Sequence, residues 1–430
     1  MIRDFFPVSD ELMALDARVL AACRPQFAAI EDIRDYNQLK MLKAFTDCRV
    51  SATHLTGTTG YGYDDVGREK LGEVFARLTG SEDALFRPHF LSGTHALTVA
   101  LFGVLRTGDT MLCVTGRPYD TLCSVIGLTG EKGCGSLMDF GVRYEQVDLT
   151  ADGAPDLPAI EAAIAAGACG EAPRKKICYV QRSRGYADRP ALTLEQIAAI
   201  AAAARRADPK IRIVVDNCYG EFTQKQEPTQ VGADLMIGSL IKNPGGGIAP
   251  TGGYIAGKHD LVELCAQRLT APGTGRELGC TQDVLRQMYL GLYYAPGVTA
   301  EALKTAVYAQ CLFAQLGYRT TPEYTAPHND IVTSIECRSA QALVALCAGI
   351  QAGSPVDSYV TPEPWQMPGY EDEVVMAAGA FTLGSSIELS CDGPLRAPFT
   401  AYMQGGLNFA ASRAGILMAA QKMQDGRSAR

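Results

Sequence analysis

The chain has 430 residues, of which 47% are hydrophobic and 20% are charged, and its formal net charge is −8. This length favours two domains over one, and the scattered basic residues argue against nucleic acid or an anionic membrane as a partner. No apolar run approaches the roughly 18–20 residues of a membrane-spanning helix, and the N-terminus lacks the regions of a signal peptide. We therefore expect a cytoplasmic protein.

The 14 cysteines are dispersed, without a Cys-x-x-Cys pair, and the five histidines show no metal-ligand spacing. Residues such as Cys113, Cys178 and Cys347 are typical of small buried hydrophobes in a reducing compartment. The sequence therefore predicts neither disulfides nor a metal site.

The first predicted element is a helix over residues 9–48, which begins at the N-cap residue Ser9. A glycine-rich stretch follows over residues 56–63 and contains Tyr61 and Tyr63. With Arg68, these tyrosines are candidates for phosphate or substrate contacts, including contacts across a subunit boundary. The alternative is an aromatic loop that only packs.

Between residues 90 and 216 the predicted helices and strands alternate. Helices are expected over residues 94–105, 119–126, 157–166 and 193–207, and strands over residues 110–114, 142–147, 177–181 and 211–215. Repeated units of this length indicate a mostly parallel central sheet flanked by helices. Ligands of such a sheet bind outside the carboxyl ends of its strands.

The remaining elements change in character after about residue 320. Before it we expect a strand over 252–257 and helices over 261–269 and 281–316; after it, strands over 331–336, 375–382 and 386–389, a helix over 340–351 and a last helix from 407. We therefore predict an α/β protein in three parts. These are an N-terminal helical segment over 1–60, a large α/β domain over 61–300 and a small α+β domain over 301–430.

A Ser92-Gly93-Thr94 turn precedes the predicted helix 94–105. Such a turn presents unpaired N–H groups and the positive end of a helix dipole, which suits a phosphate group, and the two hydroxyls add donors. A plain N-cap is the alternative. Ser239, three residues before Lys242, is a candidate for a further phosphate contact.

Two residues stand where apolar strands end: Asp216 after residues 211–215, and Lys242 after the run 234–239. This arrangement suits pyridoxal phosphate, in which the lysine forms a Schiff base and the aspartate keeps the pyridine nitrogen protonated. Tyr119, which follows another strand, could stack on the cofactor ring. The alternative is a surface lysine in a glycine loop beside an unrelated aspartate.

Three arginines are candidates for substrate recognition, because a guanidinium pairs with a carboxylate or phosphate through two hydrogen bonds. Arg182 and Arg184 follow the strand 177–181, and Arg396 lies in a proline-bounded loop of the small domain. Arg396 is the candidate for the α-carboxylate of an amino acid. Solvated loop charges or a structural ion pair are the alternatives.

Taken together, the motifs resemble those of pyridoxal-phosphate enzymes of the aspartate aminotransferase fold (fold type I). The nearest likeness is to the cystathionine and methionine γ-lyase branch, and within it to the lyase-like proteins called aluminium resistance proteins. The segments that carry this resemblance are Gly60–Arg68, Ser92–Leu97, Arg117–Thr121, Gln181–Tyr186, Val215–Phe222, Lys242–Gly247 and Gln404–Leu407.

The resemblance implies that Lys242 is the Schiff-base lysine, that Asp216 faces the pyridine nitrogen and that Tyr119 stacks on the ring. It also implies a homodimer or homotetramer with active sites at the subunit interface. The γ-lyases carry a Tyr-Ser-Arg phosphate clamp from the neighbouring subunit, and this sequence lacks that tripeptide. The segment from Tyr61 to Arg68 is the candidate to replace it.

We therefore predict a pyridoxal-phosphate-dependent carbon–sulfur lyase that acts on a sulfur-containing L-amino acid by β- or γ-elimination. An aminotransferase or aldolase on the same fold is one alternative, because the cofactor supports all of these reactions. A pyridoxal-phosphate-binding protein without turnover is another. A dinucleotide-binding domain would need a Gly-x-Gly-x-x-Gly turn after its first strand, where the sequence has none.

Overall fold

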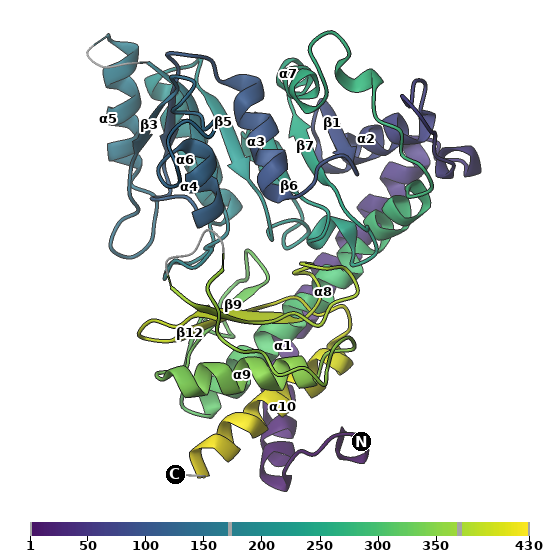
Figure 1. Ribbon diagram of the computed structural model, residues 1–430, viewed down its shortest axis with the longest axis vertical. Coiled ribbons are helices and arrows are strands. Elements are labelled where there is room, and N and C mark those ends of the chain that lie inside the picture. Colours follow the sequence, from purple (N-terminus) through teal and green to yellow (C-terminus); the bar gives the residue numbers. More distant parts are fainter. Residues whose placement is uncertain (1, 171–173, 368–371, 429–430) are drawn as a thin grey trace. The chain divides into compact units, whose positions relative to one another are not determined.

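The computed structural model in Figure 1 describes residues 2–170, 174–367 and 372–428. Its residues form two compact units. The large unit comprises Leu39–Leu240 and Ile248–Tyr293, and the small unit comprises Met1–Gln38, Ile241–Gly247 and Tyr294–Arg430. None of the helices in the described ranges combines the length and apolar character that crossing a bilayer requires.

The large unit is built on a seven-stranded sheet with the order β1-β7-β6-β5-β4-β2-β3. Its strands are β1 (Asp83–Arg87), β2 (Thr110–Cys113), β3 (Arg143–Gln146), β4 (Lys175–Gln181), β5 (Arg212–Asp216), β6 (Leu235–Ser239) and β7 (Gly253–Gly257). Strands β2 to β6 are mutually parallel, and β7 runs antiparallel to both of its neighbours. The predicted mostly parallel sheet is thus confirmed.

Helices cover both faces of this sheet (Figure 1). They are α2 (Val66–Thr79), α3 (Gly93–Val104), α4 (Asp120–Ile126), α5 (Leu157–Ala168), α6 (Leu194–Ala207) and α7 (His259–Leu269). Along β2, Met111 and Cys113 join the hydrophobic core with α3, α4 and α7, whereas Leu112 joins the core with α5 and α6. Because successive strand residues point to opposite faces, a sheet covered on both faces requires continuous apolar strands.

The small unit contains a five-stranded antiparallel sheet with the order β10-β11-β12-β9-β8. Its strands are β8 (Arg319–Thr321), β9 (Val332–Glu336), β10 (Val374–Ala377), β11 (Ser390–Pro394) and β12 (Thr400–Gln404). Helices α9 (Ala340–Ala352) and α10 (Phe409–Ser428) pack against each other through small residues, since a side chain at Gly349 would overlap Ala419. An α+β character was predicted here.

The described ranges also contain two long helices, α1 (Asp10–Asp47) and α8 (Leu285–Gln315), and five short 3₁₀ helices. The 3₁₀ helices are η1 (Ile2–Asp4), η2 (Ala52–Leu55), η3 (Pro228–Val231), η4 (Asn243–Gly245) and η5 (Gly275–Glu277). Helix α8 continues through Pro296, inside the predicted helical range 281–316.

The units divide the chain differently from the predicted parts 1–60, 61–300 and 301–430. The first 38 residues belong to the small unit because α1 is tied to the C-terminal half of the chain. The buried carboxylate of Asp16 accepts hydrogen bonds from the Tyr308 hydroxyl at 2.7 Å and from Arg413 Nε at 2.6 Å. The short segment Ile241–Gly247 also belongs to the small unit, where Ser386 N donates to Ile241 O at 3.2 Å.

Candidate active site

The start of α3 forms a narrow cradle in the large unit. Ser92 is the N-cap, and its hydroxyl accepts a hydrogen bond from His95 N at 3.1 Å. A Cβ atom on Gly93 would lie 3.2 Å from Cβ of Ser239 and 3.6 Å from Sγ of Cys218. The first turn of α3 therefore approaches the carboxyl end of β6 and the loop after β5.

Ser239 is the last residue of β6, and its hydroxyl shows whether the surrounding residues fit a phosphate group. Its side chain is 1% exposed, and its Oγ has no hydrogen-bond partner among the described residues. A buried hydroxyl without a partner costs about 1–3 kcal/mol, so native proteins rarely leave one unsatisfied. A phosphate oxygen at the start of α3 would satisfy it, and the residues present therefore fit a phosphorylated cofactor.

Tyr119 lies beside this cradle. Its hydroxyl is 3.1 Å from Thr94 Oγ1, which is also 3.1 Å from Thr121 Oγ1. The backbone N of Tyr119 donates to Gln181 Oε1 at 2.9 Å. The structure thus brings Tyr119 together with Thr94, and Thr121 joins them although no pattern in the sequence indicated it.

Asp216 ends β5, the strand next to β6, and is 4% exposed. Its Oδ1 accepts a hydrogen bond from Cys218 N at 3.1 Å, and its Oδ2 lies 3.5 Å from the hydroxyl of Tyr179. Burial and the negative charge of Asp216 raise the pKa of Tyr179 well above its usual value. Tyr179 therefore stays protonated and can donate to the carboxylate.

Lys242 follows β6 closely and precedes η4. Three Cα–Cα steps of 3.8 Å keep the Cα atoms of Ser239 and Lys242 within about 11 Å of each other. Gly246 and Gly247 adopt positive φ angles of 57° and 68°, which favour glycine. A side chain on Gly247 would also collide with Leu407. The glycine run after the lysine is thus required by backbone conformation and by close packing.

Arg182 and Arg184, predicted to recognise substrate, are buried and bonded within the protein. The guanidinium of Arg182 donates to Asn217 Oδ1 at 2.8 Å and to Gly220 O at 3.0 Å, and the side chain has 0% exposure. Arg184 Nε donates to Ala187 O at 3.1 Å. The sequence indicates their charge but not their burial, and these contacts favour a role in holding loops.

Arg396, the predicted contact for the α-carboxylate of an amino acid, is exposed in the turn between β11 and β12. Its Nη1 pairs with Asp372 Oδ2 at 3.1 Å. This exposed ion pair is the structural alternative that the sequence left open, and the carboxylate contact stays a prediction.

Tyr61 and Tyr63 lie on a well-anchored loop and are 72% and 57% exposed. Arg68, which is buried, donates from Nη1 to Gly62 O at 2.9 Å and to Gly279 O at 2.7 Å. Its guanidinium therefore holds this loop against the segment before α8. The two tyrosine rings, 5.6 Å apart, remain available for contacts.

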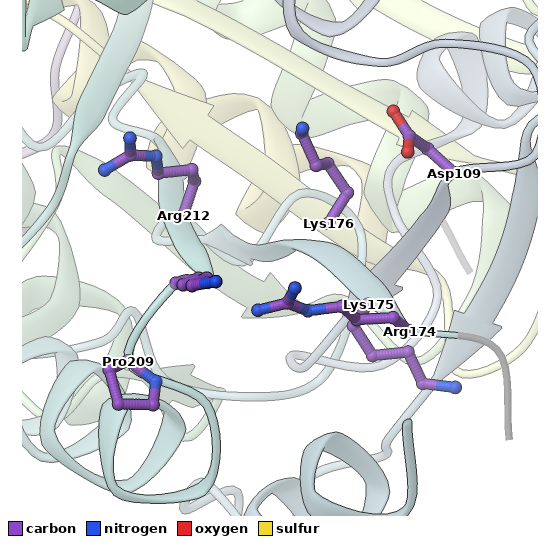
Figure 2. A pocket seen from close by; sticks show the side chains of 7 residues that line it. Asp109, Arg174, Lys175, Lys176, Pro209 and Arg212 are labelled. Carbon is purple, nitrogen blue, oxygen red and sulfur yellow. The ribbon is translucent and has the colours of Figure 1, made fainter. Parts of the chain in front are cut away.

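A basic cavity of about 530 Å³ lies at the opposite edge of the large sheet (Figure 2). It is lined by Asp109, Arg174, Lys175, Lys176, Pro209, Lys210 and Arg212, close to the amino ends of β4 and β5. Arg174 Nε pairs with Asp208 Oδ2 at 2.7 Å, and Lys175 Nζ pairs with Glu145 Oε1 at 2.5 Å. This cavity is distinct from the Ser92–Thr94 cradle, and several of its cations are neutralised by carboxylates.

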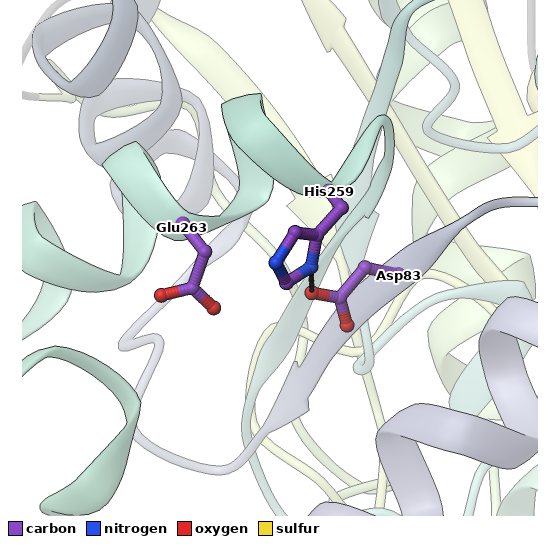
Figure 3. Close-up of side chains that lie close together, drawn as sticks. All are labelled: Asp83, His259 and Glu263. Atoms are coloured by element: carbon purple, nitrogen blue, oxygen red, sulfur yellow. Dashed lines mark hydrogen bonds and ion pairs between the residues drawn. The ribbon is translucent and has the colours of Figure 1, made fainter.

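A second cluster joins Asp83, His259 and Glu263, whose nearest ligand atoms lie within 4.8 Å of one another (Figure 3). His259 Nδ1 is 2.8 Å from Asp83 Oδ2. The guanidinium of Arg276 pairs with both carboxylates. Since Arg276 already supplies a positive charge there, we assign this cluster to an ion-pair network between β1 and α7.

The mostly parallel sheet, the cradle at α3 and the residues that end β5 and β6 have the architecture of pyridoxal-phosphate enzymes of fold type I. The crystal structure of the pyridoxal-5′-phosphate-dependent protein YhfS from Escherichia coli shares this fold, with a TM-score of 0.61 at 15% identity over 92% of this chain and 97% of that chain. The chain belongs to the methionine γ-lyase family, because the family model described as methionine gamma-lyase matches residues 12–424.

Two relatives resemble this chain over nearly its whole length. The solved carbon–sulfur lyase involved in aluminum resistance from Clostridium novyi NT is 48% identical, covers 96% of each chain and has a TM-score of 0.92. The uncharacterized protein YnbB of Bacillus subtilis (strain 168) is 46% identical over 394 residues, 92% of each chain. The predicted family and its lyase class are thus confirmed.

Proposed function

We propose that this lyase uses pyridoxal 5′-phosphate, held by Lys242, to eliminate a thiol from a sulfur-containing L-amino acid. One observation carries the cofactor assignment: the unsatisfied, buried hydroxyl of Ser239 stands beside Gly93 at the start of α3. A phosphate there would place the rest of the cofactor near Asp216, on the adjacent strand.

When bound, pyridoxal phosphate supplies an electron sink for the negative charge that develops on the substrate Cα. The hydroxyls of Ser92, Thr94 and Ser239, with the first N–H groups of α3, would hold the phosphate. Asp216 would stabilise the protonated pyridine nitrogen by its charge. Tyr119 would stack on the ring, because its hydroxyl is already fixed beside Thr94.

Lys242 would perform the proton transfers. Its Nζ would hold the cofactor in the resting enzyme and would become free when the substrate amino group takes its place. The free amine would take the proton from the substrate Cα. The electron pair of the broken C–S bond would leave on sulfur, Lys242 would return the proton to that sulfur, and hydrolysis would release ammonia and a 2-oxo acid.

We also propose a homodimer or homotetramer in which Tyr61 and Tyr63 face a second copy, with active sites at the interface. The support is their exposure on a loop that Arg68 anchors. A cytoplasmic location forms part of the proposal, because every cysteine of the chain, all of them within the described ranges, is a free thiol.

The test is the visible absorption of the purified protein while L-amino acids are added singly, with the 2-oxo acid and thiol measured in parallel. We expect a yellow band that changes with a sulfur-containing amino acid, and loss of turnover in Lys242→Ala. Lys176→Ala, in the basic cavity, is the matched control and should stay active. A band that no amino acid changes would favour a non-catalytic binder, and 2-oxo acid without thiol would favour an aminotransferase.

A further inference from the structure

We propose that Arg182 is a positioning residue for Asp216, and that it acts by clamping the loop of residues 217–224. This inference rests on the proposed function, in which Asp216 faces the pyridine nitrogen. Arg182 itself has no exposed surface and is bonded to protein acceptors. Its effect on the cofactor would therefore travel through the loop that follows β5.

The clamp consists of hydrogen bonds from one guanidinium to several parts of the loop. Arg182 donates to Asn217 Oδ1 at 2.8 Å, Gly220 O at 3.0 Å, Gln224 Oε1 at 3.0 Å and Thr223 Oγ1 at 3.3 Å. Its backbone N also donates to Asp216 O at 3.0 Å. A guanidinium has five N–H donors in a rigid plane, so it can hold both ends of the loop at once.

The loop needs this clamp because its backbone is strained. Tyr219 and Phe222 have φ angles of 71° and 61°, in the left-handed region that residues other than glycine seldom adopt. Such residues persist only where the surroundings fix them. Gly220 shows how tightly the loop approaches the arginine, since a Cβ atom there would lie 2.5 Å from Arg182 Nη1.

The loop in turn fixes the carboxylate of Asp216. Asn217 is fully buried between the Arg182 guanidinium and Glu227, to which its Nδ2 donates at 3.1 Å. The next residue, Cys218, donates its N–H to Asp216 Oδ1 at 3.1 Å. The other carboxylate oxygen lies 3.5 Å from the Tyr179 hydroxyl. The contact of Cys218 N with this carboxylate therefore depends directly on the clamped loop.

Lysine in place of Arg182 keeps the charge but offers donors from only one nitrogen, so it cannot reach all four acceptors. Arg189→Lys is the matched control. Arg189 is also buried, but its guanidinium donates to carbonyl groups outside the loop: those of Ser183 at 2.5 Å, Gln181 at 2.9 Å, Pro190 at 3.0 Å and Arg182 at 3.4 Å. It therefore matches Arg182 in burial and position, and these bonds tie residues 181–190 to one another rather than to residues 217–224.

Two measurements test the inference on the full chain. The first is amide hydrogen exchange of residues 217–224 in the protein without cofactor. We expect Arg182→Lys to raise this exchange at least about tenfold, as loss of roughly 1.4 kcal/mol would do, and Arg189→Lys to leave it within about twofold. The second is a pH titration of the visible absorption of bound pyridoxal phosphate, which gives its midpoint, the pH at which half of the visible band has changed.

We expect that midpoint to rise in Arg182→Lys. A misplaced Asp216 no longer holds the proton on the pyridine nitrogen, so the ring withdraws fewer electrons and the attached Lys242 nitrogen stays protonated to higher pH. Gln224→Ala removes one acceptor of the Arg182 guanidinium, on the half-buried part of the loop. It should also raise the pH midpoint, but by less than Arg182→Lys does. This variant serves if Arg182→Lys does not fold.

The outcomes separate the inference from the proposed function. A wild-type protein without a visible band would overturn both. A wild-type band with an unchanged midpoint in Arg182→Lys, or in Gln224→Ala if only that variant folds, would overturn the positioning role alone, even if exchange increases. Unchanged exchange would show that Arg182 is not a clamp.

Discussion

Removing the hydroxyl of Ser239 should have opposite effects on the protein with and without cofactor. In the protein alone, this hydroxyl is buried and has no partner among the described residues, so Ser239→Ala removes a desolvation cost of about 1–3 kcal/mol. Because 1 kcal/mol corresponds to about 2–4 °C in a unit of this size, the Tm of the cofactor-free protein should rise by several degrees.

The same substitution should weaken cofactor binding. A hydrogen bond to a charged phosphate contributes about 1.5–3 kcal/mol, which corresponds to about a 10- to 150-fold increase in the Kd for pyridoxal phosphate. Thermal denaturation of the cofactor-free protein gives the first quantity, and titration of the visible band gives the second. A higher Tm without cofactor together with a higher Kd for pyridoxal phosphate would show that the Ser239 hydroxyl binds the cofactor and does not stabilise the fold.

Ser390→Ala is the matched control. Ser390 lies on β11 in the small unit, and its buried Oγ also lacks a partner within the described ranges. This variant should raise the Tm without changing the Kd for pyridoxal phosphate. The reasoning fails if Ser239→Ala lowers the Tm of the cofactor-free protein, or if both variants bind the cofactor equally well.

Two further predictions concern the large unit. Gly93→Ala should weaken cofactor binding at least about tenfold, because the added methyl group would lie 3.2 Å from Ser239 Cβ and would narrow the space between α3 and β6. Gly103→Ala is the control in the same helix. Its methyl group would lie 3.0 Å from Cys265 Cα, so this variant should lower the Tm without changing the affinity for pyridoxal phosphate. Burial lowers the pKa of His89, whose Nδ1 has no partner among the described residues. As the pH falls, the His89 imidazole therefore becomes protonated in the unfolded chain before it does in the folded protein. The free energy of unfolding should then decrease as the pH drops below about 6.5. His89→Gln should reduce that fall in urea denaturation; an identical pH dependence in both proteins would contradict it.

The sequence predicted the large sheet because its periodicity survives folding. In β2, β4 and β5 nearly every residue is buried, since helices cover both faces, and such strands form recognisable apolar runs. The small sheet was harder to predict. Strand β11, Ser390–Pro394, contains no residue with a strong strand preference and forms through pairing with β10 and β12, whereas the sequence suggested a strand over residues 386–389.

The cradle was predictable for a related reason. Ser92, Gly93 and Thr94 are consecutive, and Asp216 and Ser239 each end a strand, so local sequence and strand order suffice to bring them together. The domain boundaries were not predictable in this way. The contact of Asp16 with Tyr308 and Arg413 joins segments several hundred residues apart, and no local pattern indicates it.

The arginines show what separates a binding group from a positioning group. The sequence gives the charge of Arg182 and its place after a strand, and both features suit a substrate carboxylate as well as they suit a loop clamp. Only the hydrogen-bond partners distinguish the two roles. The guanidinium of Arg182 is bonded to the loop after Asp216, whereas the hydroxyl of Ser239 is equally buried and has no partner within the described part of the chain. A folded protein tolerates the cost of such a hydroxyl most readily where a ligand offsets it. The unsatisfied serine therefore supports the proposed cofactor site, and the bonded arginine supports the proposed positioning of the neighbouring aspartate.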